Sequence, residues 1–457
     1  MGKFYNWFNV IVADRFIPIK KLGSGSFSQV WMSYDFKDNI YVATKLYFSK
    51  DYSNGEHEAK VYTELNKLKS NNILKFLGSY NYKNKDNNRK YFINVFDLML
   101  FSSQNILKMD TFYNFGIPYE HTMKIFKKIL EGVAEIHKLG YLHGDIKPEN
   151  ILVEGVSNSC KEIMKKLNLQ NFVKKKSRSE LPKLLIKHIE KNIVEEDMVS
   201  DSDSDDDETY SDDDDESEYD SSNYSESGSS DASSINSDYD DRISISDSDS
   251  EIEDDLDQDK IINSANLTAE KIKTEYDFLM NNCNNIKISD FGSSVKINNV
   301  DKTKKHIQTP YYRPPEILLR VDFNEKIDIW ALGCILYEYL TGDILFDADD
   351  YDKTNYVRHH LFLINQTIGS IPMELVEQTS DKHIVFINNT NLIKCSDDFN
   401  QSNMLLNKLK KKLINKNLSD EEYNNLIDIF IKMLDCDKNK RITVNELLNH
   451  PIFKNIK

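Results

Sequence analysis

The sequence of 457 residues predicts an α+β fold with a small antiparallel β-sheet lobe that carries one helix, followed by a larger, mainly helical lobe. Three observations predict this division. Strand-like patterns occur at 16–47, 73–80 and 90–96, with a polar turn at 83–89. Between them, 56–69 has apolar residues at helical spacing. After residue 100 the helical pattern dominates, which predicts the second lobe.

Two segments carry that second lobe. Tyr119–Leu139 has apolar residues on one face, and Gly140 is placed to end the helix. Asp328–Leu340 is apolar almost all round, which predicts a buried central helix.

The charge is distributed unevenly. Apolar residues make up 39% of the chain, enough for a core, and the net charge is −17. Segment 195–259 contains 29 acidic residues and one basic residue, Arg242, so the rest of the chain carries a net charge of +11. Such a segment is too charged and too poor in apolar residues to fold, so we expect disorder there.

Other composition features narrow the setting. The five cysteines lack C-x-x-C spacing, which argues against a zinc site and a disulfide framework and favours a reducing compartment. No apolar run reaches the roughly 20 residues that a membrane helix needs. We therefore expect an intracellular monomer, cytoplasmic, nuclear or both, without membrane association or direct nucleic-acid binding.

The stretch Tyr141–Val153 carries the pattern H-x-D-x-K-P-E-N before an apolar strand. Phosphoryl transfer depends on positioning and charge neutralisation, and this spacing can orient a hydroxyl, a phosphate and a metal together. We expect Asp145 to orient the substrate hydroxyl, Lys147 to steady the transferred phosphoryl group, and Asn150 to hold Mg²⁺. A polar turn before a strand is the plain alternative.

A second metal ligand follows much later. Ile286–Gly292 reads as a strand ending in D-F-G, and Asp290 is the carboxylate that would bind Mg²⁺ bridging the phosphates. Two oxygen ligands, Asn150 and Asp290, suit a hard cation.

A nucleotide site is predicted by a glycine-rich stretch between two strands and a lysine on the third. Glycines two apart let the backbone turn tightly over a phosphate, and Lys45 can pair with the α- and β-phosphates of ATP. Ser28 stands where a third glycine is usual. The residues expected around ATP here are Leu22, Gly23, Ser24, Gly25, Ser26, Phe27, Ser28, Val30, Ala43 and Lys45.

An acid on the helix at 56–69 should hold Lys45 in register. Glu58 is preferred because Ala59, Tyr62 and Leu65 then follow on the apolar face, and Glu56 and Glu64 remain alternatives. Phe96 would close the back of the purine pocket. Backbone groups of Asp97 and Met99 are expected to bind adenine.

The chain resembles a eukaryotic-type Ser/Thr protein kinase, and within that superfamily it is most similar to the SR-protein kinases of the CMGC group. The residues that carry the resemblance are Leu22–Trp31, His143–Asn150, Ile307–Thr309 with Tyr312-Arg313, and His360–Gly369. The resemblance implies the bilobal kinase fold, with an N-lobe at 16–100, a C-lobe at 101–154 and 284–457, and an insert at 155–283.

The resemblance also implies roles for single residues. Thr309 and Lys147 would lie beside Asp145, which favours Ser/Thr acceptors. Many kinases carry an arginine where this chain has Gly144, so we expect activity without activating phosphorylation. Asp328 would accept hydrogen bonds from the catalytic turn.

Two further implications concern the C-lobe and the substrate. Glu316 would form a buried ion pair with Arg441. Protein substrates would be basic, Arg/Ser-rich sequences among them, and Glu149 is compatible with a basic residue upstream of the acceptor.

Three interpretations of the acidic part of the insert stay open: a solvated spacer, a phosphorylated regulatory or localising segment, and a segment that covers the basic catalytic body.

Two alternative functions of the whole chain are also weighed. A pseudokinase scaffold predicts loss of Lys45, Asp145, Asn150 or Asp290, and all four are present. A small-molecule kinase would not need Lys147 or the segment 311–316, which is expected to dock a peptide substrate.

Overall fold

The computed structural model describes residues 6–194 except 86, 110, 111, 114 and 175–179; residues 273, 274, 277, 278, 281, 285–299, 307–348, 356–380, 386, 387, 390 and 391; and residues 402–454 and 456 except 415 and 417. They belong to one compact unit, 1–203 with 271–457. The predicted disordered segment 195–259 lies outside the described residues. No helix in the described part is long and apolar enough to cross a membrane.

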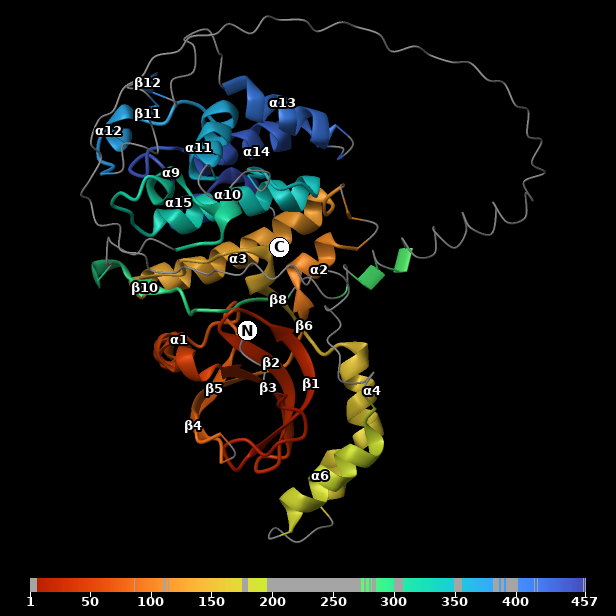
Figure 1. Ribbon diagram of the computed structural model, residues 1–457. Helices are drawn as coiled ribbons and strands as arrows, with labels where there is room; N and C mark the ends of the chain where they lie inside the picture. The colour runs from red at the N-terminus through yellow and green to blue at the C-terminus, as the bar shows by residue number, and fades with distance from the viewer. Residues whose placement is uncertain are drawn as a thin grey trace, which may run out of the picture. The chain divides into compact units, whose positions relative to one another are not determined.

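The first lobe is a five-stranded antiparallel sheet in the order β1-β2-β3-β5-β4, with helix α1 beside it (Figure 1). Its elements are β1 (Phe16–Ser24), β2 (Ser28–Asp35), β3 (Ile40–Tyr47), α1 (Tyr52–Leu65), β4 (Phe76–Lys83) and β5 (Lys90–Phe96). The predicted α+β architecture is confirmed. Helix α1 begins at Tyr52, before the predicted start at Glu56.

The prediction of a strand at 73–80 is wrong in its position, since β4 begins at Phe76 and runs to Lys83. Residues 72–74 pair elsewhere: Ile73 forms a parallel bridge with Ile288, and Leu74 N donates to Ile288 O at 2.9 Å. The apolar pattern is therefore real, but its first part joins the two lobes.

Residues before the predicted N-lobe boundary at residue 16 also pack against the sheet. Trp7 and Val12 are buried in one cluster with Phe16 and Trp31. The Trp7 and Tyr91 rings are packed edge to face, with their centroids 4.8 Å apart. Trp7 and Val12 are therefore part of the sheet's core.

The second lobe is built around α10 (Lys326–Thr341), and α3 (Tyr119–Lys138) packs against it. Residues 327–341 of α10 are all buried, as the apolar pattern predicts. Two short sheets flank the catalytic turn, β6-β8-β9 and β7-β10. The remaining elements of this lobe are β6 (Met99–Ser102), α2 (Ser103–Leu107), β7 (Tyr141–Leu142), β8 (Ile151–Glu154), β9 (Ile286–Ile288), β10 (Val295–Lys296), α9 (Pro315–Leu318), α11 (Tyr356–Thr367), α12 (Met373–Val376), β11 (Phe386–Ile387), β12 (Thr390–Asn391), α13 (Ser402–Leu413), α14 (Asp420–Met433) and α15 (Val444–Leu448).

The predicted ion pair of Glu316 and Arg441 is present and wholly buried. Arg441 Nη1 and Nη2 donate to the two Glu316 oxygens at 2.7 and 3.0 Å. Neither side chain is exposed. The guanidinium also lies 5.0 Å from the Trp330 ring. This pair joins α9 to the chain between α14 and α15.

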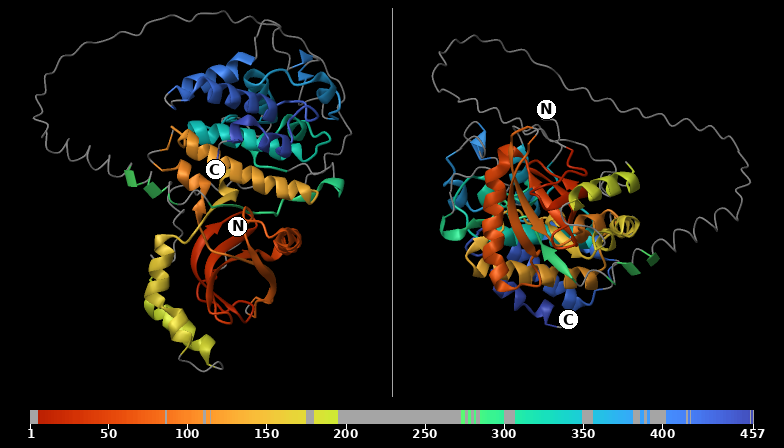
Figure 2. Two further views of the ribbon diagram at one scale, coloured as in Figure 1. Left: turned by 180° about the vertical axis from the view of Figure 1, so that it is seen from behind. Right: turned by 90° about the horizontal axis from the view of Figure 1, so that it is seen from below.

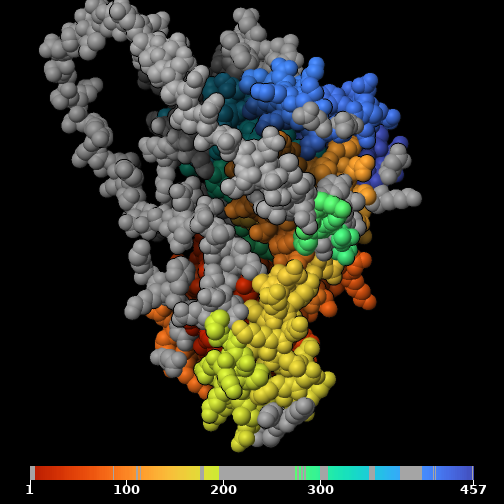
Figure 3. All heavy atoms as spheres, turned by 90° about the vertical axis from the view of Figure 1, so that its right-hand side faces the viewer, coloured from red at the N-terminus to blue at the C-terminus, as the bar shows by residue number. Residues whose placement is uncertain are grey.

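The first part of the insert folds onto the N-lobe. Helices α4 (Asn158–Leu167), α5 (Leu169–Val173) and α6 (Leu181–Asn192) lie beside the first strands in both views of Figure 2, and in Figure 3 they lie in front of the first lobe. Their apolar residues are buried with those of β1 and β2, a cluster comprising Ile17, Ile19, Met32, Tyr34, Cys160, Ile163, Leu167, Leu169, Leu181, Leu185, Ile189 and Ile193. Leu22 and Leu98 pack against the same cluster. These helices complete the core on one face of the sheet.

Candidate active site

The catalytic turn, residues 143–150, joins β7 to β8 and brings Asp145, Lys147 and Thr309 together. Asp145 Oδ1 accepts from Thr309 N at 2.9 Å and from Thr309 Oγ1 at 2.8 Å. Lys147 Nζ donates to Thr309 Oγ1 at 2.9 Å and lies 3.3 Å from Asp145 Oδ2. Burial alone would lower the pKa of Lys147, but the charges of Asp145, Glu149 and Asp290 outweigh it and raise that pKa. Lys147 is thus a fixed cation beside Asp145.

Asp328, at the start of α10, stabilises this turn through hydrogen bonds to its backbone. Its carboxylate accepts from His143 N at 2.8 Å and Gly144 N at 3.0 Å, and His137 Nε2 lies 2.9 Å away. Although burial would raise the pKa of Asp328, these partners lower it. The predicted acceptor role of Asp328 is therefore present in the structure. His143 is also structural, because it is fully buried and its Nε2 lies 3.0 Å from Ser289 O.

Asn150 and Asp290 offer oxygen atoms in the same region. Ser289 N and Oγ donate to Asn150 O at 2.9 and 3.0 Å, which fixes the start of the D-F-G segment next to Asn150. Asn150 Nδ2 donates to Asp145 O at 2.8 Å, so its amide oxygen faces away from that bond. The Asp290 side chain is 44% exposed, and its backbone φ of 62° is left-handed. An amide oxygen and a carboxylate fit Mg²⁺, which takes few protein ligands and keeps its waters. Among the described residues, no cluster of three or more His, Cys, Asp or Glu could hold a metal.

Lys45 lies between two carboxylates. Its Nζ is 2.9 Å from Glu58 Oε1 and 3.0 Å from Asp290 Oδ1. Burial would lower the pKa of Lys45, but these two charges raise it well above its usual value, and the ammonium in turn lowers the pKa of Asp290. Of the three glutamates considered, Glu58 is therefore the partner of Lys45. Glu64 pairs with Lys296 at 3.1 Å instead.

The glycine-rich stretch spans the end of β1 and the start of β2. Gly23, Val30 and Lys45 are neighbours across three strands, because Gly23 pairs with Val30 and Val30 with Lys45. Gly25 N donates to Ser28 O at 2.9 Å and closes the loop. A Cβ at Gly23 or Gly25 would meet no atom within 4 Å, so the backbone is open to a phosphate there. The remaining predicted contacts on these strands and their loop, Leu22, Ser24, Ser26, Phe27, Ser28 and Ala43, occupy positions consistent with this arrangement.

The predicted adenine contacts lie where β5 leads into β6. Ala43 pairs with Phe96 across β3 and β5, so the end of β5 adjoins the glycine-rich strands. Met99 begins β6. Asp97 N already donates to Lys75 O at 3.3 Å, which leaves its carbonyl as the group to consider for adenine.

Glu338 is a buried carboxylate whose pKa responds to the nearby charge of Glu149 in the catalytic turn. Glu338 on α10 accepts from the Tyr312 hydroxyl at 2.8 Å. Burial and the nearby charge of Glu149 raise the pKa of Glu338 to about 7, although the Tyr312 bond opposes the shift. Glu149 itself is exposed. Because like charges repel, this pair would favour a cation placed near both.

Gly144 has a geometric reason to be glycine. Its φ is +80°, and a Cβ there would lie 2.8 Å from Ser293 O and 3.0 Å from Ile307 Cδ1. Ser293 and Ile307, which follow the D-F-G segment, thus pack directly on the turn at Gly144. The expectation of activity without activating phosphorylation stays a prediction.

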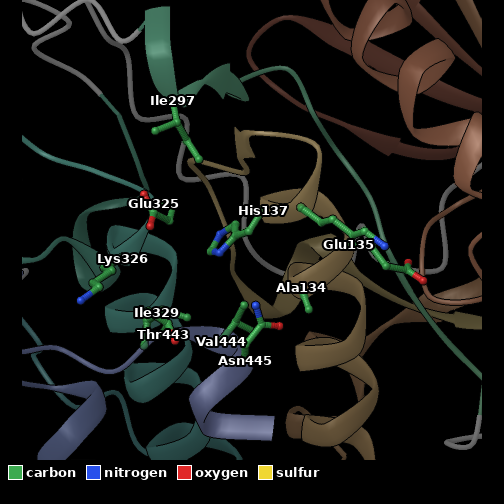
Figure 4. Close-up of a pocket in the computed structure, with 11 residues that line it drawn as sticks. Ala134, Glu135, His137, Ile297, Glu325, Lys326, Ile329, Thr443, Val444 and Asn445 are labelled. Carbon is green, nitrogen blue, oxygen red and sulfur yellow. The ribbon is translucent and has the colours of Figure 1, made fainter.

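A cavity of about 520 Å³ lies between α3, α10 and α15 (Figure 4). His137 points into it and also reaches Asp328. None of the predicted catalytic, nucleotide or metal residues, all of which are described, lines this cavity. It lies next to His137, which contacts Asp328, and it is separate from the predicted nucleotide site.

Sequence reasoning missed Tyr47 and Asn94, which both contact Glu58. Signals for them exist. Tyr47 is two residues after Lys45, so both side chains lie on one face of β3. Asn94 is a polar residue inside the otherwise apolar part of β5.

The chain matches the protein kinase domain family over residues 16–175 and 270–453. It is 28% identical to a protein of Acanthamoeba polyphaga mimivirus described as a serine/threonine-protein kinase, over 98% of this chain and 88% of that one. It is 30% identical to the dual specificity protein kinase CLK4 of Homo sapiens over 38% of this chain, and 29% identical to the serine/threonine-protein kinase AFC3 of Arabidopsis thaliana over 37%. These two matches span only 34% and 41% of the relatives' own lengths. The predicted likeness to SR-protein-type kinases is confirmed, and nothing supports the scaffold alternative.

Proposed function

The chain belongs to the protein kinase domain family and is a serine/threonine protein kinase, and we propose that it transfers the γ-phosphoryl group of ATP to basic protein substrates through Asp145, Lys147 and Lys45. The observation that carries the proposal is that the Thr309 hydroxyl accepts a hydrogen bond from Lys147 and donates one to Asp145. Transfer depends on placing the acceptor hydroxyl in line with the phosphate.

The contacts of each residue support the role that we propose for it. Asp145 accepts the hydrogen bond of the incoming hydroxyl, and Thr309 fixes the carboxylate. Lys147 stays charged beside it and stabilises negative charge on the moving phosphoryl group. Lys45, held by Glu58, pairs with the remaining phosphates. Asn150 and Asp290 would hold magnesium, which supplies charge neutralisation at the phosphates when bound.

The preference for basic substrates is supported by Glu149 and Glu338. The charge of the exposed Glu149 carboxylate acts on the pKa of the buried Glu338 carboxylate, and Glu338 accepts a hydrogen bond from Tyr312, three residues after Thr309. An arginine can bind two carboxylates with its planar donors, and its charge would relieve their repulsion. Arg/Ser-rich proteins provide both the cation and the acceptor.

A substrate panel tests the proposal. We expect radiolabel transfer from ATP to an Arg/Ser-rich protein and a generic basic protein to exceed transfer to an acidic protein by at least about tenfold. Glu149→Gln should narrow that difference. The control is Glu421→Gln, an exposed glutamate in the first turn of α14. No transfer to any protein would contradict the activity, whereas equal transfer to acidic and basic proteins would contradict only the substrate class.

The KM for a basic peptide should depend on pH because Glu338 titrates near neutrality. The carboxyl is neutral below its pKa of about 7 and charged above it. We therefore expect KM to fall several-fold as the pH rises from 6 to 8, since only the charged form attracts the peptide. In Glu338→Gln this part of the profile should be flat. A wild-type KM that rises over this range would oppose the assignment.

A further inference from the structure

The Glu58 carboxylate is enclosed by three donors. Oε1 accepts from Lys45 Nζ at 2.9 Å. Oε2 accepts from Asn94 Nδ2 at 2.9 Å and from the Tyr47 hydroxyl. Glu58 and Asn94 are fully buried, and Tyr47 is 2% exposed. Because no water reaches the carboxylate, these side chains replace its hydration.

The strand register makes these donors converge. Lys45 and Tyr47 share one face of β3, and Asn94 is the residue opposite Lys45 in the β3–β5 pairing. All three side chains therefore meet the same turn of α1. The convergence comes from pairing between strands whose sequences lie about fifty residues apart.

The backbone of α1 is drawn against the same strands. Asn94 Nδ2 also donates to Gly55 O at 3.2 Å. A Cβ at Gly55 would lie 2.7 Å from Tyr47 Cδ2 and 2.9 Å from Phe92 Cδ1. Helix and sheet thus approach closely where Asn94 and Tyr47 act.

Lys45 alone is a weak anchor for Glu58, because Asp290 competes for the same ammonium at 3.0 Å. If Oε2 lost its donors, the buried carboxylate would favour an outward position where water could reach it. Burial keeps the Tyr47 phenol protonated by raising its pKa, so it remains a donor.

We propose that Tyr47 and Asn94 are positioning residues that hold Glu58 and α1 against Lys45, so that the nucleotide site is assembled without an added phosphate. This inference rests on the proposed function, because it assigns a supporting role to the Lys45–Glu58 pair. It also offers a physical reason why this chain can have Gly144 where many kinases carry an arginine. Neither Tyr47 nor Asn94 is assigned contact with the reacting atoms.

The test is a double-mutant cycle measured by steady-state kinetics on the full chain. Tyr47→Phe removes one hydroxyl, and Asn94→Leu removes the amide at similar volume. We expect each to lower kcat about tenfold while the KM for the protein substrate changes less than twofold. In a Glu58→Gln background, Tyr47→Phe should change kcat less than twofold. Tyr80→Phe, on β4 against Phe16, is the control and should be neutral.

The outcomes separate the inference from the proposed function. Full kcat in Tyr47→Phe and Asn94→Leu would overturn the inference, as would an equal loss from Tyr47→Phe in the wild-type and Glu58→Gln backgrounds. A Glu58→Gln variant with unchanged kcat would instead remove the proposed role of Glu58. Thermal unfolding of each variant identifies a loss that reflects misfolding, and such a loss in both positioning variants would also count against the inference.

Discussion

Replacing Asp145 with asparagine is expected to lower kcat by about 10³-fold, the scale of a lost general base or hydroxyl-orienting group. The amide keeps the size of the side chain and can still bond to Thr309, so the turn should stay folded. The amide lacks the negative charge that attracts the proton of the acceptor hydroxyl. In the wild type this charge also lies beside Lys147, whose Nζ is 3.3 Å from Asp145 Oδ2. Initial rates of radiolabel transfer, measured at saturating ATP and substrate, provide the value.

ATP affinity gives the necessary comparison for Asp145→Asn. No predicted nucleotide contact involves Asp145, so ATP binding should change less than about threefold. Asp420→Asn, an exposed residue in the first turn of α14, is the matched control for the chemical change. Transfer within tenfold of the wild-type rate in Asp145→Asn would remove Asp145 from the mechanism.

The second large effect is expected on stability. Glu316→Gln should lower the free energy of unfolding by about 3–5 kcal/mol, because it leaves the Arg441 charge buried without its counter-ion. The side chains of both partners are completely inaccessible, so water cannot compensate. Urea unfolding can be followed by tryptophan fluorescence, to which Trp330, next to the Arg441 guanidinium, contributes together with Trp7 and Trp31 of the first lobe.

Two comparisons sharpen this stability measurement. Combining Glu316→Gln with Arg441→Met removes the stranded charge, and the double variant should be less destabilised than the sum of the single ones. Lys432→Gln breaks the exposed pair with Asp428, which should cost less than about 1 kcal/mol. Equal costs for the buried and exposed pairs would refute the reasoning.

The parts of the site that the sequence predicts well are those whose residues are close in the chain. The spacing of Asp145, Lys147 and Asn150 is fixed by one turn, and the D-F-G segment locates Asp290. Glu58 could be preferred over Glu56 and Glu64 because helical periodicity determines which side faces the core. Local geometry is sufficient for such predictions.

The features that were missed depend on pairing through space. A polar residue at Asn94 reads as an interruption of an apolar strand until β3 and β5 are in register. The apolar residues of 73–80 indicate burial, but they do not reveal that Ile73 pairs with Ile288. Amphipathic helices in the insert show that one face must be covered, yet the pattern does not identify β1 and β2 as the cover.

The docking of α4–α6 on the sheet determines where this chain can be shortened. Removing everything between β8 and β9 would uncover Ile17, Ile19 and Met32 and present water with an apolar strip on the glycine-rich side of the enzyme. A trimmed version intended for crystallisation should therefore keep the residues up to Val194 and be cut only beyond them.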